Sequence, residues 1–326
     1  MKPLRPQFFS ISRRPLETCV FCNLRTTYPP FRTYASAPLI PTENPNEDEF
    51  FPKPLARPLG LQKPPRPSEN TGIDSRSWRE RREDFVNYDK HIVKREKLSN
   101  GLAKSYFRDW GNLRVAKGKT FIAVPKLFRA DRALYYPNLQ GVTLASPDEP
   151  QDTTPILRGK LSVVRMFSSE WAKRQTESFV AEDQNPELCE VLRAGKAVGA
   201  QMVDVNVEDN WVKAALIKLF MPSLRKKLPE EGHGRYFLIT SGLTEKLRVC
   251  IGLVNSKVGY VYLVDEKCKI RWAGSGKADQ TEKESIVNGL KRLIEVRKGI
   301  RGTGGTAAKK DIDNTKSTKK QTASAA

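Results

Sequence analysis

Two cysteines three residues apart, Cys19 and Cys22, have the spacing of a redox dithiol or of half a zinc site. A redox dithiol follows a buried strand and opens a helix, because the helix N-terminus lowers the thiol pKa. Here Pro15 precedes the pair and Tyr28-Pro29-Pro30 follows it. A zinc site needs a second pair at short spacing, and the next cysteine is Cys189. We therefore expect neither redox nor metal chemistry from this pair.

The run Gly274-Ser275-Gly276-Lys277 invites comparison with a P-loop, whose backbone amides cradle phosphate groups. That motif requires a glycine five residues before Gly276 and a hydroxyl residue directly after Lys277. Arg271 and Ala278 occupy these positions. We expect a tight connection between a strand and a helix here instead of a nucleotide site.

The remaining reactive residues give no support to nucleophilic catalysis. Neither His91 nor His233 has an acid and a nucleophile at a recognisable spacing. Cys189, Cys250 and Cys268 are scattered and odd in number, so they indicate no disulfide framework. We predict that the protein is not an enzyme and that it holds no cofactor and no metal.

Residues 1–34 have the composition of a mitochondrial presequence, with six basic residues against the single acid Glu17. The junction Arg32-Thr33-Tyr34-Ala35-Ser36 resembles a matrix-processing site, because arginine lies just upstream and a small residue follows the cut. We expect cleavage after Thr33 or Tyr34, so that the mature chain begins near Ala35 and lacks the Cys19–Cys22 pair. The alternative is a flexible basic tail that is retained.

The net charge of +20 is partly a property of the two ends of the chain. The presequence contributes about +5 and the segment from Arg297 about +6. The remaining body is moderately basic, which suits anionic partners such as a cardiolipin-rich membrane, RNA or an acidic protein face. No run approaches the roughly 18 apolar residues of a spanning helix, so we expect a soluble or peripheral protein.

The segments before the core differ in composition. Residues 35–75 are rich in proline and predict an extended linker. Residues 76–110 are charged, with apolar positions at Trp78, Phe85, Ile92 and Tyr106, and predict a basic helical region. This region is either a nucleic-acid arm or a helix that lies on its own domain or on a partner. Residues 111–158 predict an irregular extension with short strands near 120–124 and 142–144, and residues 299–326 a disordered basic tail.

The core domain is expected at residues 159–298, where strand and helix patterns alternate. Ser168 or Ser169 can cap a first helix, whose inner face is Trp171, Ala172, Gln175 and Phe179. A second helix can begin at Asn185. A third can begin at Asn210, and we expect Pro222 to end it. A last helix over 281–297 buries Ile286, Val287, Leu290, Leu293 and Ile294. The predicted strands are 160–167, 200–207, 235–240, 249–254, 260–264 and 269–272. Together these elements predict an α/β sandwich, and their order resembles the thioredoxin-like fold.

Two positions of that fold lack the groups that redox members use. The thiol belongs where the first core strand meets its helix, but Ser168-Ser169-Glu170 occupies the junction, and Glu170 would raise the pKa of a thiol. A cis-proline usually precedes the strand that begins at Tyr260, but Val258 and Gly259 stand there. The predicted fold is therefore thioredoxin-like without its redox motif.

The segment from Trp211 to Leu228 is the most suggestive surface, because it joins apolar and basic residues. Such a combination suits a membrane interface or the exposed end of a hydrophobic client. The alternative is a helix packed between the sheet and the N-terminal arm, with a solvated basic end. The candidate contact residues are Trp211, Phe220, Met221, Arg225, Lys226 and Lys227.

Several stretches together resemble the mitochondrial F-type ATP synthase assembly factor ten family. They are Tyr136-Pro137-Asn138 with Gly141, Leu157-Arg158-Gly159-Lys160, Trp211 with the basic helix end, and Ile270 to Ala278 followed by Glu282 and Glu284. The most specific is Arg271-Trp272-x-Gly274-x-Gly276-x-Ala278, and the likeness covers roughly residues 97–297. The resemblance implies a non-enzymatic chaperone, peripheral on the matrix side of the inner membrane. It also implies that the protein binds newly made subunit 6 and helps it to join the ring of subunit 9.

Two other classes of function stay open. A thioredoxin-like oxidoreductase would need a reactive thiol at Cys189, Cys250 or Cys268. A mitochondrial RNA- or ribosome-associated protein would explain the charge. The aromatic and basic strand motifs of common RNA-binding domains are absent, so we expect no nucleic-acid partner.

Overall fold

The computed structural model describes residues 51–73, 77–86, 92 and 109–299. The chain divides into two units, Met1–Pro45 and Asn46–Ala326, and the first lies wholly outside the described residues. The predicted presequence, its boundary at Tyr34 and Ala35, and the tail from residue 300 therefore also lie outside them.

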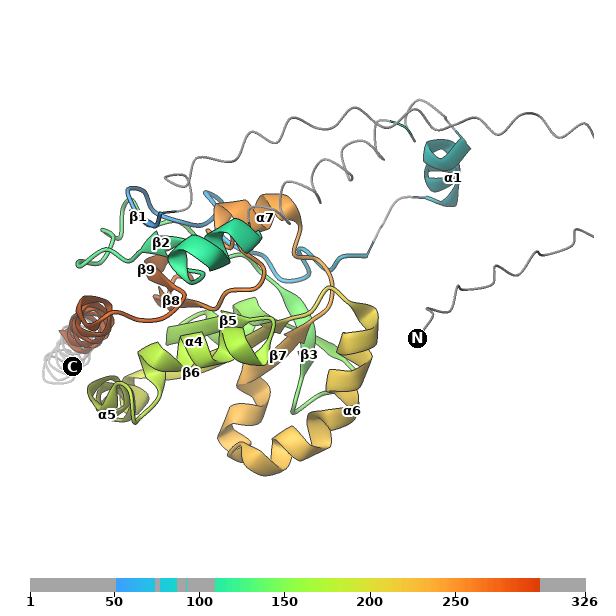
Figure 1. Ribbon diagram of the computed structural model, residues 1–326. Coiled ribbons are helices and arrows are strands. Elements are labelled where there is room, and N and C mark those ends of the chain that lie inside the picture. The colour runs from blue at the N-terminus through green and yellow to red at the C-terminus, as the bar shows by residue number, and fades with distance from the viewer. Residues whose placement is uncertain (1–50, 74–76, 87–91, 93–108, 300–326) are drawn as a thin grey trace, which may run out of the picture. The chain divides into compact units, whose positions relative to one another are not determined.

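A seven-stranded mixed sheet forms the centre of this unit (Figure 1). Three neighbouring strands run parallel, and antiparallel strands flank them on both sides. The parallel strand β5 is buried along its whole length, which explains why its sequence is nearly continuous in apolar residues. In spatial order the strands are β4 (Pro150–Asp152), β3 (Gln140–Thr143), β7 (Tyr236–Ile239), β6 (Ala200–Val207), β5 (Leu161–Phe167), β8 (Tyr260–Val264) and β9 (Ile270–Ser275).

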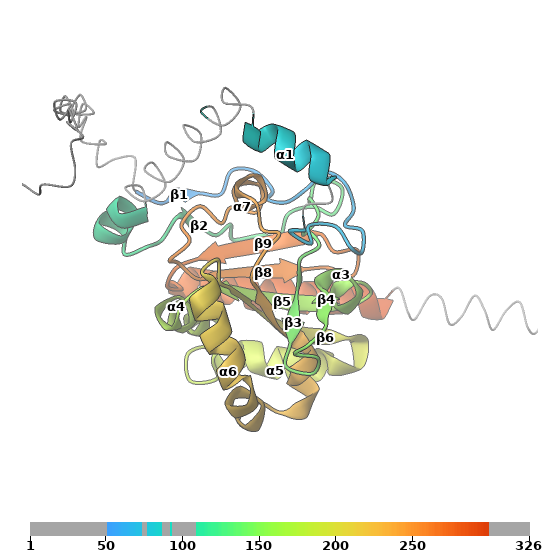
Figure 2. The ribbon, with the colours of Figure 1, turned by 90° about the vertical axis from the view of Figure 1, so that its right-hand side faces the viewer.

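Helices cover both faces of the sheet (Figure 2). One face packs against α4 (Glu170–Val180), α5 (Pro186–Gly195), α6 (Trp211–Lys227) and a helix over residues 280–299. The other face carries α3 (Thr153–Leu157), α7 (Glu245–Cys250) and part of the chain before residue 62. The parallel unit β5-α4-β6, the antiparallel pair β8-β9 and the final helix confirm the predicted thioredoxin-like sandwich.

The expected capping residues begin their helices. Ser169 accepts from the amide of Ala172 at the start of α4, and Asn185 accepts from Leu188 at the start of α5. Asn210 accepts from the amides of Val212 and Lys213 at the start of α6. Each side chain replaces a helical partner that the first turn lacks, which fixes where the helix starts.

Three sequence expectations about the core are wrong. Residues 249–254 are not a strand, because Thr244 caps the short helix α7 and Leu253 then donates to the carbonyl of Arg248. Pro222 does not stop α6, which runs to Lys227; the proline lies on the exposed side, where water can replace its missing donor. Trp171 is 45% exposed and does not belong to the inner face of α4, unlike Ala172, Gln175 and Phe179.

The segments before residue 159 contribute to the sheet and to its cover. Strands β3 and β4 join its edge, and β1 (Lys53–Pro54) pairs in parallel with β2 (Phe121–Ile122) in a separate two-stranded sheet. Helix α1 (Trp78–Val86) exposes Trp78, with the guanidinium of Arg82 lying 5.7 Å from the ring centroid.

The glycine-rich run after β9 is a strand-to-helix connection, as expected. Strand β9 ends at Ser275, whose Oγ accepts from the amides of Thr120 and Phe121 and donates to the carbonyl of Phe121. Glu282, at the start of the last helix, is buried and accepts from Lys119 Nζ at 2.6 Å and from the amide of Ala123 at 2.8 Å. The run therefore anchors residues 119–123 on the core.

Candidate functional site

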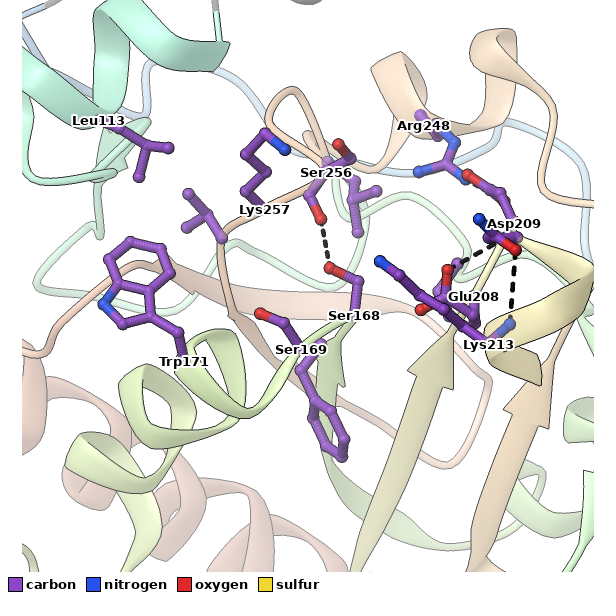
Figure 3. Close-up of a pocket in the computed structure, with 15 residues that line it drawn as sticks. Leu113, Ser168, Ser169, Trp171, Glu208, Asp209, Lys213, Arg248, Ser256 and Lys257 are labelled. Carbon is purple, nitrogen blue, oxygen red and sulfur yellow. Dashed lines mark hydrogen bonds and ion pairs between the residues drawn. The ribbon is translucent and has the colours of Figure 1, made fainter. Parts of the chain in front are cut away.

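A cleft of about 460 Å³ lies where strands β5 and β6 end (Figure 3). Ligands of open α/β sheets bind outside the carboxyl ends of parallel strands, so its position is that of a binding site. The lining comes from five segments: Leu113, residues 167–169 with Trp171, residues 207–210 with Lys213, Arg248 with Leu253, and residues 256–258. We call it the strand-end cleft.

Hydroxyl groups occupy the junction of β5 and α4 in this cleft. Ser168 donates to the carbonyl of Ser256, and Ser169 is the N-cap of α4. The Ser168 bond ties the junction to the loop that precedes β8. The first core strand therefore meets its helix at Ser168 and Ser169, where the sequence predicted the junction.

One wall of the strand-end cleft is charged. Arg248 donates to both carboxylate oxygens of Asp209, at 2.8 and 2.6 Å, so these two charges are paired. Glu208 is buried, and its carboxylate accepts from the amide of Asn210 at 3.2 Å.

Lys213 reaches from the first turn of α6 into the cleft (Figure 3), and no ion pair engages it among the residues that the structure describes. The ammonium of Lys257 lies 5.2 Å from the centroid of the Trp110 ring.

The opposite wall is apolar. Trp171, Leu113 and Val258 form it. A Cβ atom added at Gly118 would lie 3.0 Å from both Trp171 and Val258, and Gly118 has a φ of +86°. Only glycine adopts this conformation easily, and here it also lets the backbone approach the indole closely. The indole therefore packs closely against the backbone at Gly118.

Helix α6 presents an apolar face to solvent. Trp211 is 80% exposed, Leu219 is 73% exposed and Phe220 is 55% exposed, although solvent-facing helix positions are usually polar. Val212 and Leu216 are also exposed. At 100° per residue these side chains share one half of the helix, which we call the α6 face.

The buried side of α6 holds two of the residues predicted for client contact. Met221 is only 2% exposed and packs in a core cluster with Leu238 and Leu144. Arg225 is half-buried and donates to the backbone carbonyls of Leu144 and Ala145. Both side chains therefore attach α6 to the sheet, while Trp211, Phe220, Lys226 and Lys227 are exposed.

His233 lies at the end of α6 and contacts its backbone. Its Nε2 lies 3.1 Å from the carbonyl oxygen of Arg225 and 3.0 Å from that of Leu228. Both partners are acceptors, so this nitrogen carries the proton. The histidine thus donates to carbonyls that the helix end leaves unpaired.

The described cysteines lie away from the strand-end cleft. Burial raises the pKa of Cys268 to about 11, and partial burial with the nearby Glu182 charge raises the pKa of Cys189. Cys250 is exposed on α7. Since the thiolate is the nucleophile, the first two thiols are poorly suited to redox attack at neutral pH.

No helix within the described ranges is long and apolar enough to cross a bilayer. No group of three or more histidine, cysteine or acidic residues in that part of the chain could hold a metal ion.

The sequence did not point to the strand-end cleft. Its Arg248–Asp209 pair joins residues far apart in the chain, and its charged wall depends on α7, a helix that the sequence pattern did not predict. The N-cap signals of Ser169 and Asn210 could have indicated the cleft. They mark the starts of α4 and α6, and two helices that begin side by side place their first turns at one opening.

Solved structures that resemble the chain are thiol–disulfide and related proteins. A putative thiol:disulfide interchange protein DsbE from Chlorobium tepidum matches with a TM-score of 0.34 and 16% identity, over 50% of this chain and 96% of that one. BsSco, a member of the Sco family of cytochrome c oxidase assembly proteins, matches with a TM-score of 0.33 and 9% identity, over 50% and 95%.

Sequence relatives are closer. The mitochondrial ATPase complex subunit ATP10 of Candida glabrata is 30% identical over 252 residues, covering 77% of this chain and 88% of the relative. Its Saccharomyces cerevisiae counterpart is 30% identical over 264 residues, covering 78% and 91%. The family model described as ATP10 protein matches residues 38–293. The chain therefore belongs to the ATP10 protein family.

Proposed function

We propose that this protein is a non-enzymatic assembly factor of the mitochondrial ATPase complex. It binds newly made subunit 6 and promotes the association of that subunit with the subunit 9 ring, from a peripheral position on the matrix side of the inner membrane. Family membership supports the role in the complex, since the relatives are named as subunits of the mitochondrial ATPase complex.

The α6 face is the observation that carries the proposal about the client. A large exposed apolar surface on a helix costs solubility unless a partner covers it. Trp211, Leu219 and Phe220 offer aromatic and aliphatic anchors of the kind that dominate binding energies. A hydrophobic membrane subunit that still lacks its neighbours presents a matching surface.

The basic residues around this face suit an anionic bilayer. Lys213 and Lys218 flank it along the helix, and Lys226 and Lys227 extend from the last turn. Helix α6 contains no acid. Attraction to anionic headgroups would hold the protein beside its client without a membrane span.

The test is the capture of newly made subunit 6 by the tagged protein in mitochondria. Leu219→Asp with Phe220→Asp should leave the fold intact, because both side chains are exposed, and should remove subunit 6 from the purified material. Val296→Asp, at an exposed position of the last helix, is the matched control and should retain it. Equal capture of subunit 6 by the folded double variant would contradict the proposal.

A further inference from the structure

The strand-end cleft has no part in the proposed action of the α6 face, yet it combines charge, apolar surface and enclosed volume. We propose that this cleft binds a carboxylate of the client polypeptide, together with an apolar side chain that neighbours the carboxylate in an extended segment. The inference rests on the proposed function only in taking the occupant to be a client chain.

Positive charge in the cleft is left over after its internal pairing. The lining holds three cations, Lys213, Lys257 and Arg248, and two carboxylates, Glu208 and Asp209, so its net charge is +1. The Arg248–Asp209 pair is closed, and Glu208 accepts from a backbone amide. Lys213 points into the opening with no carboxylate engaged among the described residues (Figure 3). A carboxylate beside Lys213 would form a charge-assisted hydrogen bond in a partly enclosed site.

The apolar wall selects what the carboxylate is attached to. The Trp171 indole is part-exposed and packs against Gly118, so it offers a flat apolar surface to a ligand. Leu113 and Val258 extend that surface. A free inorganic anion would leave this wall uncovered, whereas an aliphatic or aromatic side chain beside the carboxylate would cover it.

Continuity with the α6 face favours a polypeptide as the occupant. Asn210 and Lys213 line the cleft and also form the cap and first turn of α6, directly beside the exposed Trp211. A chain that leaves the cleft at Lys213 therefore meets the α6 face next. One client could place a polar segment in the cleft and a hydrophobic segment on the helix.

The first test uses two peptides as probes, acetyl-Ala-Leu-Phe-Asp-amide and its Asn counterpart. The chain has five tryptophans, so ¹⁵N-tryptophan labelling of the full-length protein gives few indole signals, and Trp171→Phe identifies that of Trp171. The Asp peptide should shift the Trp171 signal and bind at least fivefold more tightly than the Asn peptide. Lys213→Gln should abolish this preference, and Lys218→Gln, which changes a lysine of the same helix outside the cleft, should keep it.

Several outcomes would overturn the proposal. They are an unmoved Trp171 signal, equal affinity for the two peptides, and a shift by sodium phosphate or acetate alone as strong as that by the Asp peptide. The last outcome would make the cleft a site for free anions.

A second test separates this proposal from the proposed function. A photoreactive residue is placed at Trp171 in one full-length protein and at Phe220 in another, and both are crosslinked to new translation products in mitochondria. Crosslinks to subunit 6 from both positions support the cleft as part of the client site. Crosslinks from Phe220 alone would leave the proposed function standing and overturn the cleft proposal.

Discussion

At the scale of single residues, the junction of β5 and α4 in the thioredoxin-like scaffold carries the hydroxyls of Ser168 and Ser169. They stand where redox proteins of this fold carry a thiol, and both are engaged in structural hydrogen bonds. This could be predicted from the sequence, because a buried strand followed by a capping residue marks the junction without tertiary information. The roles of Met221 and Arg225 could not, because burial of one helix side depends on what packs against it.

Replacing Cys189, Cys250 and Cys268 together with serine should leave assembly of the ATPase complex nearly intact. Cys189 Sγ donates to the carbonyl of Val180, a bond that a serine hydroxyl can also make. Cys268 is buried, so its replacement should lower the free energy of unfolding by about 1–3 kcal/mol. Complex assembly is measured on native gels and stability by denaturant unfolding. A well-folded triple variant that cannot assemble the complex would favour an oxidoreductase instead.

The raised pKa of Cys268 predicts a defined pH dependence of stability. Burial raises this pKa from 9.0 to about 11, so the folded state holds its proton more tightly than the unfolded state does. The resulting stability is complete below about pH 9 and is lost as the pH rises toward 11. Between these values the wild type should therefore lose more stability than Cys268→Ala does. Urea unfolding at several pH values measures this difference. If the free energies of unfolding of the wild type and the variant fall in parallel as the pH rises, the thiol does not contribute to the pH dependence.

At the scale of elements, α6 is apolar on two sides, because Ala214 and Met221 pack on the sheet while other large apolar side chains face solvent. The sequence showed a helix apolar on more than one side but not which side the sheet would cover. The extension of α6 past Pro222 and the helical state of α7 were also missed. Proline usually ends a helix, but Pro222 lies on the exposed side of α6 and the helix continues past it. The apolar run near residue 250 favoured a strand, but the cap at Thr244 begins a helix there.

Reversing only Lys226 and Lys227 to glutamate should weaken membrane binding without unfolding the protein. Both lysines are exposed, whereas Arg225 holds the carbonyls of Leu144 and Ala145 and must be kept. Each headgroup contact is worth about 1 kcal/mol and weakens with salt. Flotation with cardiolipin liposomes should therefore fall for the double variant and fall for the wild type at high salt. Unchanged flotation of the folded variant would place the lipid contact elsewhere.

At the scale of the whole molecule, the sandwich could be predicted because most of its strands and helices carry clear local patterns. The strand-end cleft could not, because it gathers residues from Leu113 to Val258. Nor could the place of β3 and β4 at the sheet edge, since their short runs carry little periodicity.

The predicted processing of the chain concerns its first residues, which lie outside the described ranges. The basic leader and the junction Arg32-Thr33-Tyr34-Ala35 predict a mature protein that begins near Ala35 and lacks Cys19 and Cys22. N-terminal sequencing of the protein isolated from the mitochondrial matrix decides this. Recovery of intact residues 1–34 would contradict it.

The most direct test of the central claim asks whether the α6 face touches subunit 6 while the complex is being built. A photoreactive residue replaces Phe220 in one protein and Val296 in another, both exposed positions, and mitochondrial translation is pulse-labelled before illumination. We expect a crosslink between position 220 and subunit 6 that fades as the complex matures, and no crosslink from position 296. Absence of the subunit 6 crosslink at position 220 in a protein that still supports assembly would contradict it.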